Sequence, residues 1–208
     1  MTVVDYRVDG RVATITLRRP EARNAVNADV AHGVEDAIDR LEADPDVWVG
    51  IIAGDGPVFS AGADLKEIAA GRVADLETER GGFGGIARRD GDKPMIAAVD
   101  GPALAGGCEI VLACDLVVAS RQAAFGLPEV KRSLVAAAGG LFRLPRKLPR
   151  NIALEIIMTG DPIDGAGADD ATAWKLTGDA LRSILGTEDF LEGPRAFVEK
   201  RPADWKGR

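Results

Sequence analysis

The sequence predicts an α/β fold in which short buried strands alternate with helices. Short apolar runs typical of buried strands recur between longer stretches whose apolar residues are spaced for one face of a helix. Glycine-rich turns separate the two kinds of segment. Aromatic residues make up only 5% of the chain, whereas Ala and Gly are abundant, which indicates that helices and strands pack with their backbones close together.

The first part of the chain predicts a hairpin, a helix and a strand. Residues 3–8 and 11–17 alternate apolar and polar side chains on either side of a tight turn, as the strands of a hairpin do. Asn27 is a suitable N-cap for a helix over residues 28–42. Residues 47–53 then predict a buried strand.

The polar stretch over residues 72–92 predicts a helix followed by a mobile loop, or one long weak helix. Its glycine-rich part, residues 81–85, does not predict a phosphate cradle, because the Lys-Ser/Thr pair and the preceding strand of such a motif are missing.

The central stretch, residues 95–120, predicts a strand, a glycine-rich turn, a helix and a second buried strand over residues 116–119. Gly106 stands where the helix begins, so its backbone N–H is free and lies at the positive end of the helix dipole. Such a position can hold an anion or a developing oxyanion. The backbone N–H of Ala63 is a second potential donor, because residues 59–68 also run from a stretch of small residues into the start of a helix. The alternative is that this segment is only a tight turn that needs small residues.

The rest of the chain predicts a short strand and several helices. The strand covers residues 123–126. The helices cover residues 136–144, 151–159, 172–185 and 188–200, and Pro145 and Pro149 separate the first two.

Composition excludes several classes of function. A net charge of −7 argues against a nucleic-acid-binding protein or one that binds an anionic membrane. The single histidine, His32, lies in a polar helical stretch and is expected at the surface, which excludes a His-dependent triad. Cys108 and Cys114 lack metal-ligand spacing and are expected to be buried thiols, so we expect no metal and a cytoplasmic location.

Three short motifs occur in a characteristic order and at characteristic separations. They are Phe59-Ser60-Ala61-Gly62-Ala63-Asp64-Leu65, then Asp100-Gly101-Pro102-Ala103-Leu104-Ala105-Gly106-Gly107-Cys108-Glu109, then Ala124-Phe125-Gly126-Leu127-Pro128-Glu129. Together they resemble the enoyl-CoA hydratase/isomerase family, the crotonase superfamily. The resemblance implies a crotonase-like spiral of ββα units over residues 1–160 with an acyl-CoA site, and a helical C-terminal region over residues 161–208.

The resemblance also implies a site and an activity. Ala63 and Gly106 would supply the oxyanion hole for a thioester carbonyl, Glu129 would protonate the substrate α-carbon, and Glu109 would activate water. By itself each glutamate could be only a first-turn acid that stabilises its helix. The implied reaction is hydration of a trans-2-enoyl-CoA to a 3-hydroxyacyl-CoA. An enoyl-CoA isomerase or other acyl-CoA lyase, and a non-catalytic acyl-CoA or protein-binding member, are the alternatives.

The family's coenzyme A segments imply further contacts. The matching positions are Arg23, Ala25, Ala61, Asp64, Leu65, Lys66 and Gly107. For Arg23 and Lys66, a charge that merely faces solvent is an equal alternative. No cofactor is implied, since coenzyme A is part of the substrate. The expected partners are the acyl-CoA thioester and further copies of the chain, in a homotrimer or a dimer of trimers.

The resemblance breaks after Ile163. The family's next strand and helix are replaced by a short run of Gly, Ala and Asp, so a few tens of residues are expected to be missing near residues 164–171. Either the protein has them and its chain is interrupted there in the structure, or the chain lacks them. Intact mass distinguishes the two.

Overall fold

The computed structural model describes residues 2–164, 187–204 and 206. The chain divides into two compact units, Met1–Ala166 and Gly167–Arg208, and each is described by itself.

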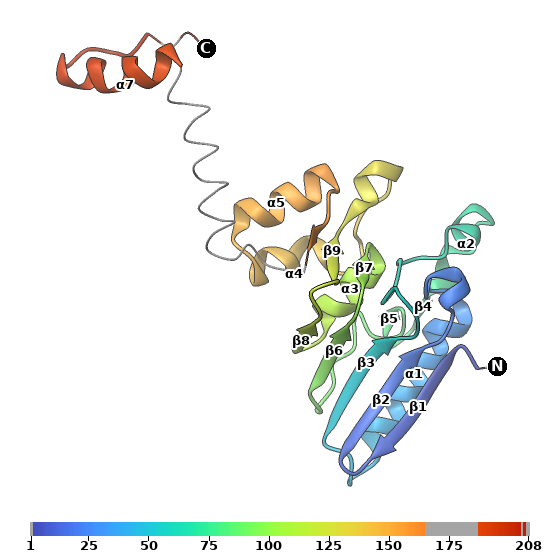
Figure 1. Cartoon of the computed structure of the whole chain (residues 1–208). Helices are drawn as coiled ribbons and strands as arrows, with labels where there is room; N and C mark the ends of the chain where they lie inside the picture. Colours follow the sequence, from blue (N-terminus) through green and yellow to red (C-terminus); the bar gives the residue numbers. More distant parts are fainter. Residues whose placement is uncertain (1, 165–186, 205, 207–208) are drawn as a thin grey trace. The chain divides into compact units, whose positions relative to one another are not determined.

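The first unit is built on a five-stranded sheet with the order β1-β2-β3-β6-β8 (Figure 1). The strands are β1 (Val4–Asp9), β2 (Val12–Leu17), β3 (Val49–Gly54), β6 (Met95–Val99) and β8 (Leu116–Ala119). β1 and β2 form the predicted antiparallel hairpin, and each later strand runs parallel to its neighbour.

Helix α1 (Ala28–Ala43) covers one face of this sheet. The Asn27 side chain caps the helix as predicted, because its Oδ1 accepts a hydrogen bond of 3.1 Å from the Val30 N–H. The buried stripe of the helix includes Val34 and Ile38, which join Ile15 of β2 in one core cluster. Each such fully buried side chain stabilises the fold by about 1.5–3 kcal/mol.

Strand β8 has the predicted bounds, but the prediction that it is buried is wrong. All four of its residues are exposed. An apolar run identifies a strand, yet burial depends on what packs against it. β8 is the last strand of the sheet, and no described strand pairs with its outer edge.

A second, three-stranded sheet has the order β10-β9-β7, with β7 (Pro102–Leu104), β9 (Ala124–Gly126) and β10 (Ile163–Asp164). β7 and β9 are parallel, so the segments that follow them leave the sheet at the same edge. These segments are helix α3 (Gly106–Ala113) and the short 3-10 helix η3 (Pro128–Arg132).

Two further helices pack around α3. They are α4 (Gly140–Lys147) and α5 (Arg150–Thr159), and their buried residues form a second core cluster with Cys108 of α3 and with Leu127. The prediction placed Pro145 between helices, whereas it lies inside α4, because the helix begins at Gly140 and continues to Lys147 instead of ending at residue 144.

The prediction for residues 72–92 is also wrong. After helix α2 (Leu65–Ala69), the chain forms the 3-10 helix η2 (Val73–Leu76) and a small hairpin of β4 (Glu77–Thr78) and β5 (Gly82–Phe83). The glycines here serve close packing. A Cβ on Gly85 would lie 2.2 Å from a backbone oxygen of α1.

The second unit contains α7 (Glu188–Val198), within two residues of the predicted helix. Arg201 forms ion pairs with Glu192 and Glu199 beside it. The predicted helix over residues 172–185 lies outside the described residues, as does most of the stretch near 164–171 where we expect a missing segment. No helix in the described ranges has both the length and the hydropathy needed to cross a bilayer.

Candidate active site

Gly106 begins α3, and its backbone N–H is free. The chain turns sharply out of β7 at Ala105, which has a φ of 51° and a ψ of −128°. The Ala105 N–H donates to the Gly126 carbonyl of β9 over 2.9 Å. The Gly106 N–H that follows has no acceptor among the described residues and lies at the positive end of the helix.

Ala63 presents a second free N–H. Residues on both sides of it pair with Val26, since the Val26 N–H donates to Gly62 over 2.8 Å and the Asp64 N–H donates to Val26 over 2.9 Å. In an extended segment the residue between two such bonds directs its own N–H to the other side. No described residue accepts from the Ala63 N–H.

Two glycines bring these donors together. The Leu104 N–H donates to the Ser60 carbonyl over 3.0 Å, which places the end of β7 beside residues 60–63. A Cβ on Gly62 would lie 2.6 Å from the Gly106 nitrogen, and a Cβ on Gly107 would lie 2.3 Å from the Ser60 oxygen. Because only glycine permits this approach, the sequence motifs with Gly62 and Gly107 position the two free N–H groups as neighbours.

Phe83 is a residue of this site that sequence reasoning missed. A Cβ on Gly106 would lie 2.4 Å from two ring carbons of Phe83, so the ring rests directly against the start of α3. The signal was present as the single aromatic residue within the glycine-rich residues 81–85.

Glu109 is a buried carboxyl one turn into α3, with 4% of its surface exposed. Its Oε1 accepts a hydrogen bond of 2.9 Å from the Gly140 N–H at the start of α4. Burial raises the pKa of Glu109 to about 7 despite hydrogen bonds from the backbone of Gly140 and Ala138 that oppose the shift, and the nearby charge of Glu129 raises it further.

Glu129 is a second buried carboxyl, carried by η3 and 8% exposed. Its Oε2 atom is buried and has no hydrogen-bond partner among the described residues. Burial raises the pKa of Glu129. Because its charge acts on Glu109, the two carboxyls lie within electrostatic reach of each other. Such a pair can hold one water molecule and move protons on and off a bound molecule.

The residues expected to contact coenzyme A are only partly brought together. The Ala61 N–H donates to the Arg23 carbonyl over 3.0 Å, so the segments with Arg23, Ala25 and Ala61 run side by side. The Asp64 carboxylate is already occupied, because it caps α2 and forms an ion pair of 3.1 Å with Arg19.

The outer positions of the expected coenzyme A contacts are open to solvent. Arg23, Leu65 and Lys66 are exposed. Gly107 is buried at the start of α3.

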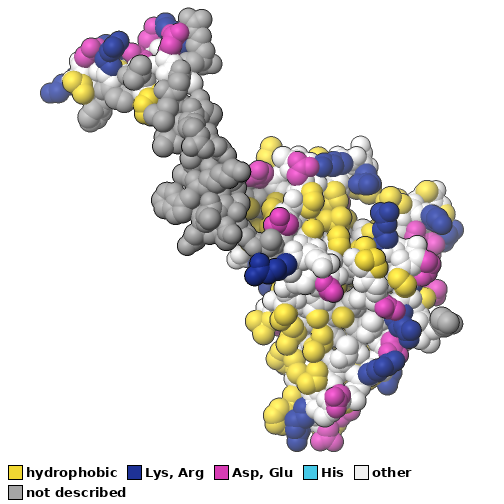
Figure 2. Space-filling view, in the orientation of Figure 1, with side chains coloured by type: hydrophobic (Ala, Val, Ile, Leu, Met, Phe, Trp, Pro, Cys, Tyr) yellow, Lys and Arg dark blue, Asp and Glu magenta, His cyan; other side chains and the backbone are white. Residues whose placement is uncertain are grey.

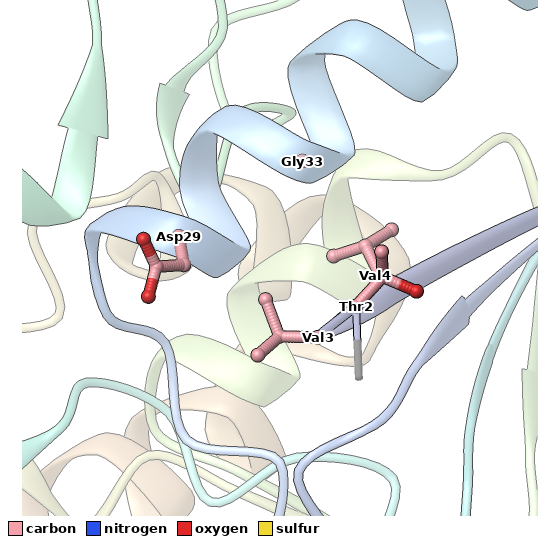
Figure 3. A pocket seen from close by; sticks show the side chains of 5 residues that line it. All are labelled: Thr2, Val3, Val4, Asp29 and Gly33. Carbon is pink, nitrogen blue, oxygen red and sulfur yellow. The ribbon is translucent and has the colours of Figure 1, made fainter.

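One surface hollow lies apart from this arrangement. Its lining residues are Thr2, Val3, Val4, Asp29 and Gly33, between the N-terminal strand and α1 (Figure 3). It contains no predicted site residue and a single carboxyl group, so it is a poor candidate for acid–base chemistry.

The comparison with known families agrees with this geometry. A profile of the enoyl-CoA hydratase/isomerase family matches residues 7–174. The chain belongs to this family. It is 35% identical to a carnitinyl-CoA dehydratase of Salmonella agona, in an alignment that covers 96% of this chain and 97% of that protein.

Solved structures of the family have the same fold. The enoyl-CoA hydratase of Mycobacterium tuberculosis is 36% identical with a TM-score of 0.75, and the carnitinyl-CoA hydratase of Mycobacterium avium is 38% identical with a TM-score of 0.74. Each comparison covers 100% of both chains. The predicted crotonase fold is therefore confirmed, and the chain is a hydratase or dehydratase of the crotonase superfamily.

The Salmonella dehydratase has residues without a counterpart in this chain. The alignment spans 256 positions, more than the 208 residues of the chain. That the missing residues fall near 164–171 stays a prediction.

Proposed function

We propose that this enzyme adds water to a trans-2-enoyl-CoA and forms a 3-hydroxyacyl-CoA. The observation that carries the proposal is the pair of buried carboxyls, Glu109 and Glu129, on the two segments that leave β7 and β9 at the same edge. Hydration needs one group that takes a proton from water and one that gives a proton to carbon, and a carboxyl pair supplies both.

The free N–H groups of Ala63 and Gly106 would bind the thioester carbonyl oxygen. Negative charge builds up on that oxygen as the hydroxyl adds to the β-carbon and an enolate forms. Donors fixed in advance at a helix start stabilise this charge without having to reorganise, and removing one such donor costs about a hundred- to thousand-fold in rate.

The two carboxyls would divide the proton transfers. Glu109 takes a proton from the water whose oxygen bonds to the β-carbon, and protonated Glu129 gives its proton to the α-carbon. The product gains one whole water, and a proton passing from Glu109 to Glu129 resets the site. Burial favours a protonated Glu129, while a Glu109 pKa of about 7 suits a base that works near neutral pH.

Carnitinyl-CoA is a second candidate substrate, because relatives at 35% and 38% identity are named for it. Dehydration is the reverse of hydration and would use the same groups. An isomerase that moves a double bond would leave the mass of its substrate unchanged, so product mass separates it from both candidates.

Two further expectations belong to this proposal. Exposed Arg23 and Lys66 would meet the phosphates of coenzyme A, since both are cations on segments beside the free N–H groups. A cytoplasmic location fits the two cysteines, which are free and buried.

The variant Glu129→Gln tests the proposal. We expect it to fold and to bind acyl-CoA, because Gln has nearly the same shape, while kcat for hydration of crotonyl-CoA falls about 10²–10⁴-fold as proton delivery is lost. Glu155→Gln, a change at an exposed glutamate of α5, is the matched control and should keep full activity. Wild-type turnover by Glu129→Gln would refute the two-carboxylate mechanism.

A further inference from the structure

Arg143, in the first turn of α4, binds backbone carbonyls from two segments outside the helix. Figure 2 shows that the Lys and Arg side chains on the face in view are spread over the surface among Asp and Glu. Arg143 is half-buried, and its guanidinium donates to the Ala87 carbonyl over 2.7 Å and to the Ala138 carbonyl over 3.1 Å. A guanidinium presents its N–H groups in a rigid fork, so the two bonds also fix the carbonyls relative to each other.

The chain just before α4 leaves room for this side chain. Gly139 has a φ of 110°, which a residue with a side chain rarely adopts. A Cβ on Gly139 would also overlap a guanidinium nitrogen of Arg143. The guanidinium therefore lies directly against the backbone at the start of α4, and a side chain at position 139 would displace it.

The same stretch of backbone holds the Glu109 carboxyl. The Gly140 N–H donates to Glu109 Oε1 over 2.9 Å. The backbone of Ala138 also forms a hydrogen bond with this carboxyl, while the Ala138 carbonyl accepts from Arg143. Ala138 thus has one polar group bonded to the carboxyl and one bonded to the guanidinium. Arg143 is connected to Glu109 through this residue, and the two side chains form no direct ion pair.

The other carbonyl that Arg143 binds belongs to the segment that carries Phe83. The Ala87 N–H donates to the Phe83 carbonyl over 3.1 Å, and the Phe83 ring lies against Gly106. Ala87 is buried, so this anchor point is inside the protein. Arg143 therefore ties the start of α4 to the segment that packs against the start of α3.

We propose that Arg143 is a positioning residue for Glu109, because it fixes the start of α4, which carries the backbone donors to that carboxyl. The inference rests on the proposed role of Glu109 as the base for hydration. Burial raises the pKa of Glu109, the charge of Glu129 on η3 raises it further, and the charge of Arg143 on α4 lowers it. The neighbouring Cys108 thiol stays neutral, because burial raises its pKa to about 12. Arg143 thus favours the ionised carboxyl that takes a proton from water.

Arg143→Gln tests the inference through the pH dependence of kcat/KM for hydration of crotonyl-CoA. The acid limb should lie at about pH 7 in wild type and move to higher pH without the positive charge. Activity at pH 6, relative to the maximum, should then fall about 3–10-fold. A residue needed only for folding would lower activity equally at every pH, so an unmoved acid limb would overturn the inference. Arg146→Gln, at an exposed arginine of the same helix, is the matched control and should keep the wild-type profile.

Arg143→Lys separates the fork from the charge, and it remains informative if Arg143→Gln does not fold. Lysine keeps the positive charge but lacks the rigid fork that binds two carbonyls at once. The acid limb should therefore stay at its wild-type position. Per folded molecule, kcat should fall several-fold while KM changes less than about twofold, because the Gly140 N–H is no longer held at Glu109. A wild-type kcat would contradict the positioning role.

Unfolding in urea tests the link without any measurement of activity. Loss of the Arg143 charge raises the folded pKa of Glu109 further above its unfolded value, so more stability is lost as the pH rises. The fall in stability between pH 5 and pH 8 should be larger in Arg143→Gln than in wild type, and the same change should add nothing in a Glu109→Gln background. Equal falls in Arg143→Gln and wild type would overturn the inference, whereas a failure of hydration alone would contradict only the proposed function.

Discussion

At the scale of single residues, burial is what distinguishes Glu109 and Glu129 from the other acids described. Both are buried, neither forms a salt bridge with a described residue, and burial raises the pKa of each, although the charge of Arg143 opposes the shift at Glu109. Backbone N–H groups from the start of α4 hold Glu109 in place. A buried carboxyl of this kind lowers the stability of the folded protein when it is charged. Measurements of stability at different pH values can therefore test this interpretation.

Glu109→Gln should change how stability depends on pH. The folded pKa, about 7, exceeds the unfolded value of about 4.3, so the folded state holds this proton more tightly. Stability due to Glu109 is therefore complete below about pH 4 and is lost as pH rises through 7, by about 2–4 kcal/mol. Urea unfolding at pH 5 and pH 8 should show a smaller fall for Glu109→Gln than for wild type. Equal falls in both proteins would contradict the assignment, and Glu155→Gln should behave like wild type.

Residue types could be predicted from motifs, but their surroundings could not. The motifs predict Glu109 and Glu129 as site residues, whereas Gly140, whose N–H donates to Glu109, lies 31 positions further along the chain and belongs to no motif. Asp64 was expected to contact coenzyme A, yet its carboxylate is occupied by a helix cap and by Arg19. These hydrogen-bond and ion-pair partners come together only in the tertiary fold, so a local sequence pattern does not predict them.

At the scale of elements, the start of α3 is the decisive feature. The chain passes from β7 to Gly106 through the strained turn at Ala105. Gly62 lies so close to the Gly106 nitrogen that no side chain would fit at position 62. The free N–H of Gly106 is thus a product of three segments that meet. A helix start alone would leave free N–H groups, but not a second donor beside them.

Gly106→Pro and Gly106→Ala together test this donor. Both add a Cβ that meets the Phe83 ring, so both should lose stability. Only proline removes the N–H. Activity per folded molecule, with circular dichroism to count the folded fraction, should therefore be about 10²–10³-fold lower in the proline variant than in the alanine variant. Equal activities would show that Gly106 matters only for packing.

At the scale of the whole molecule, the five strands of the large sheet and helices α1 and α3 followed from the sequence, because apolar runs and glycine turns are local signals, whereas the short strands β4, β5, β7 and β10 did not. Two predictions failed for nonlocal reasons. β8 looks buried in sequence and is exposed in the fold, and residues 81–85 look mobile but pack against α1. An apolar run does not reveal whether another element packs against the strand. A glycine-rich segment can be closely packed as well as flexible.

The most direct test of the account is the product formed from crotonyl-CoA in oxygen-labelled water. The wild-type enzyme should give 3-hydroxybutyryl-CoA with the label in its hydroxyl group, and a Glu109→Gln/Glu129→Gln double variant should give almost none. Mass spectrometry of the thioester reads both the added water and the label. A product of unchanged mass, or equal labelling by the double variant, would contradict the claim that these two carboxyls hydrate an enoyl-CoA.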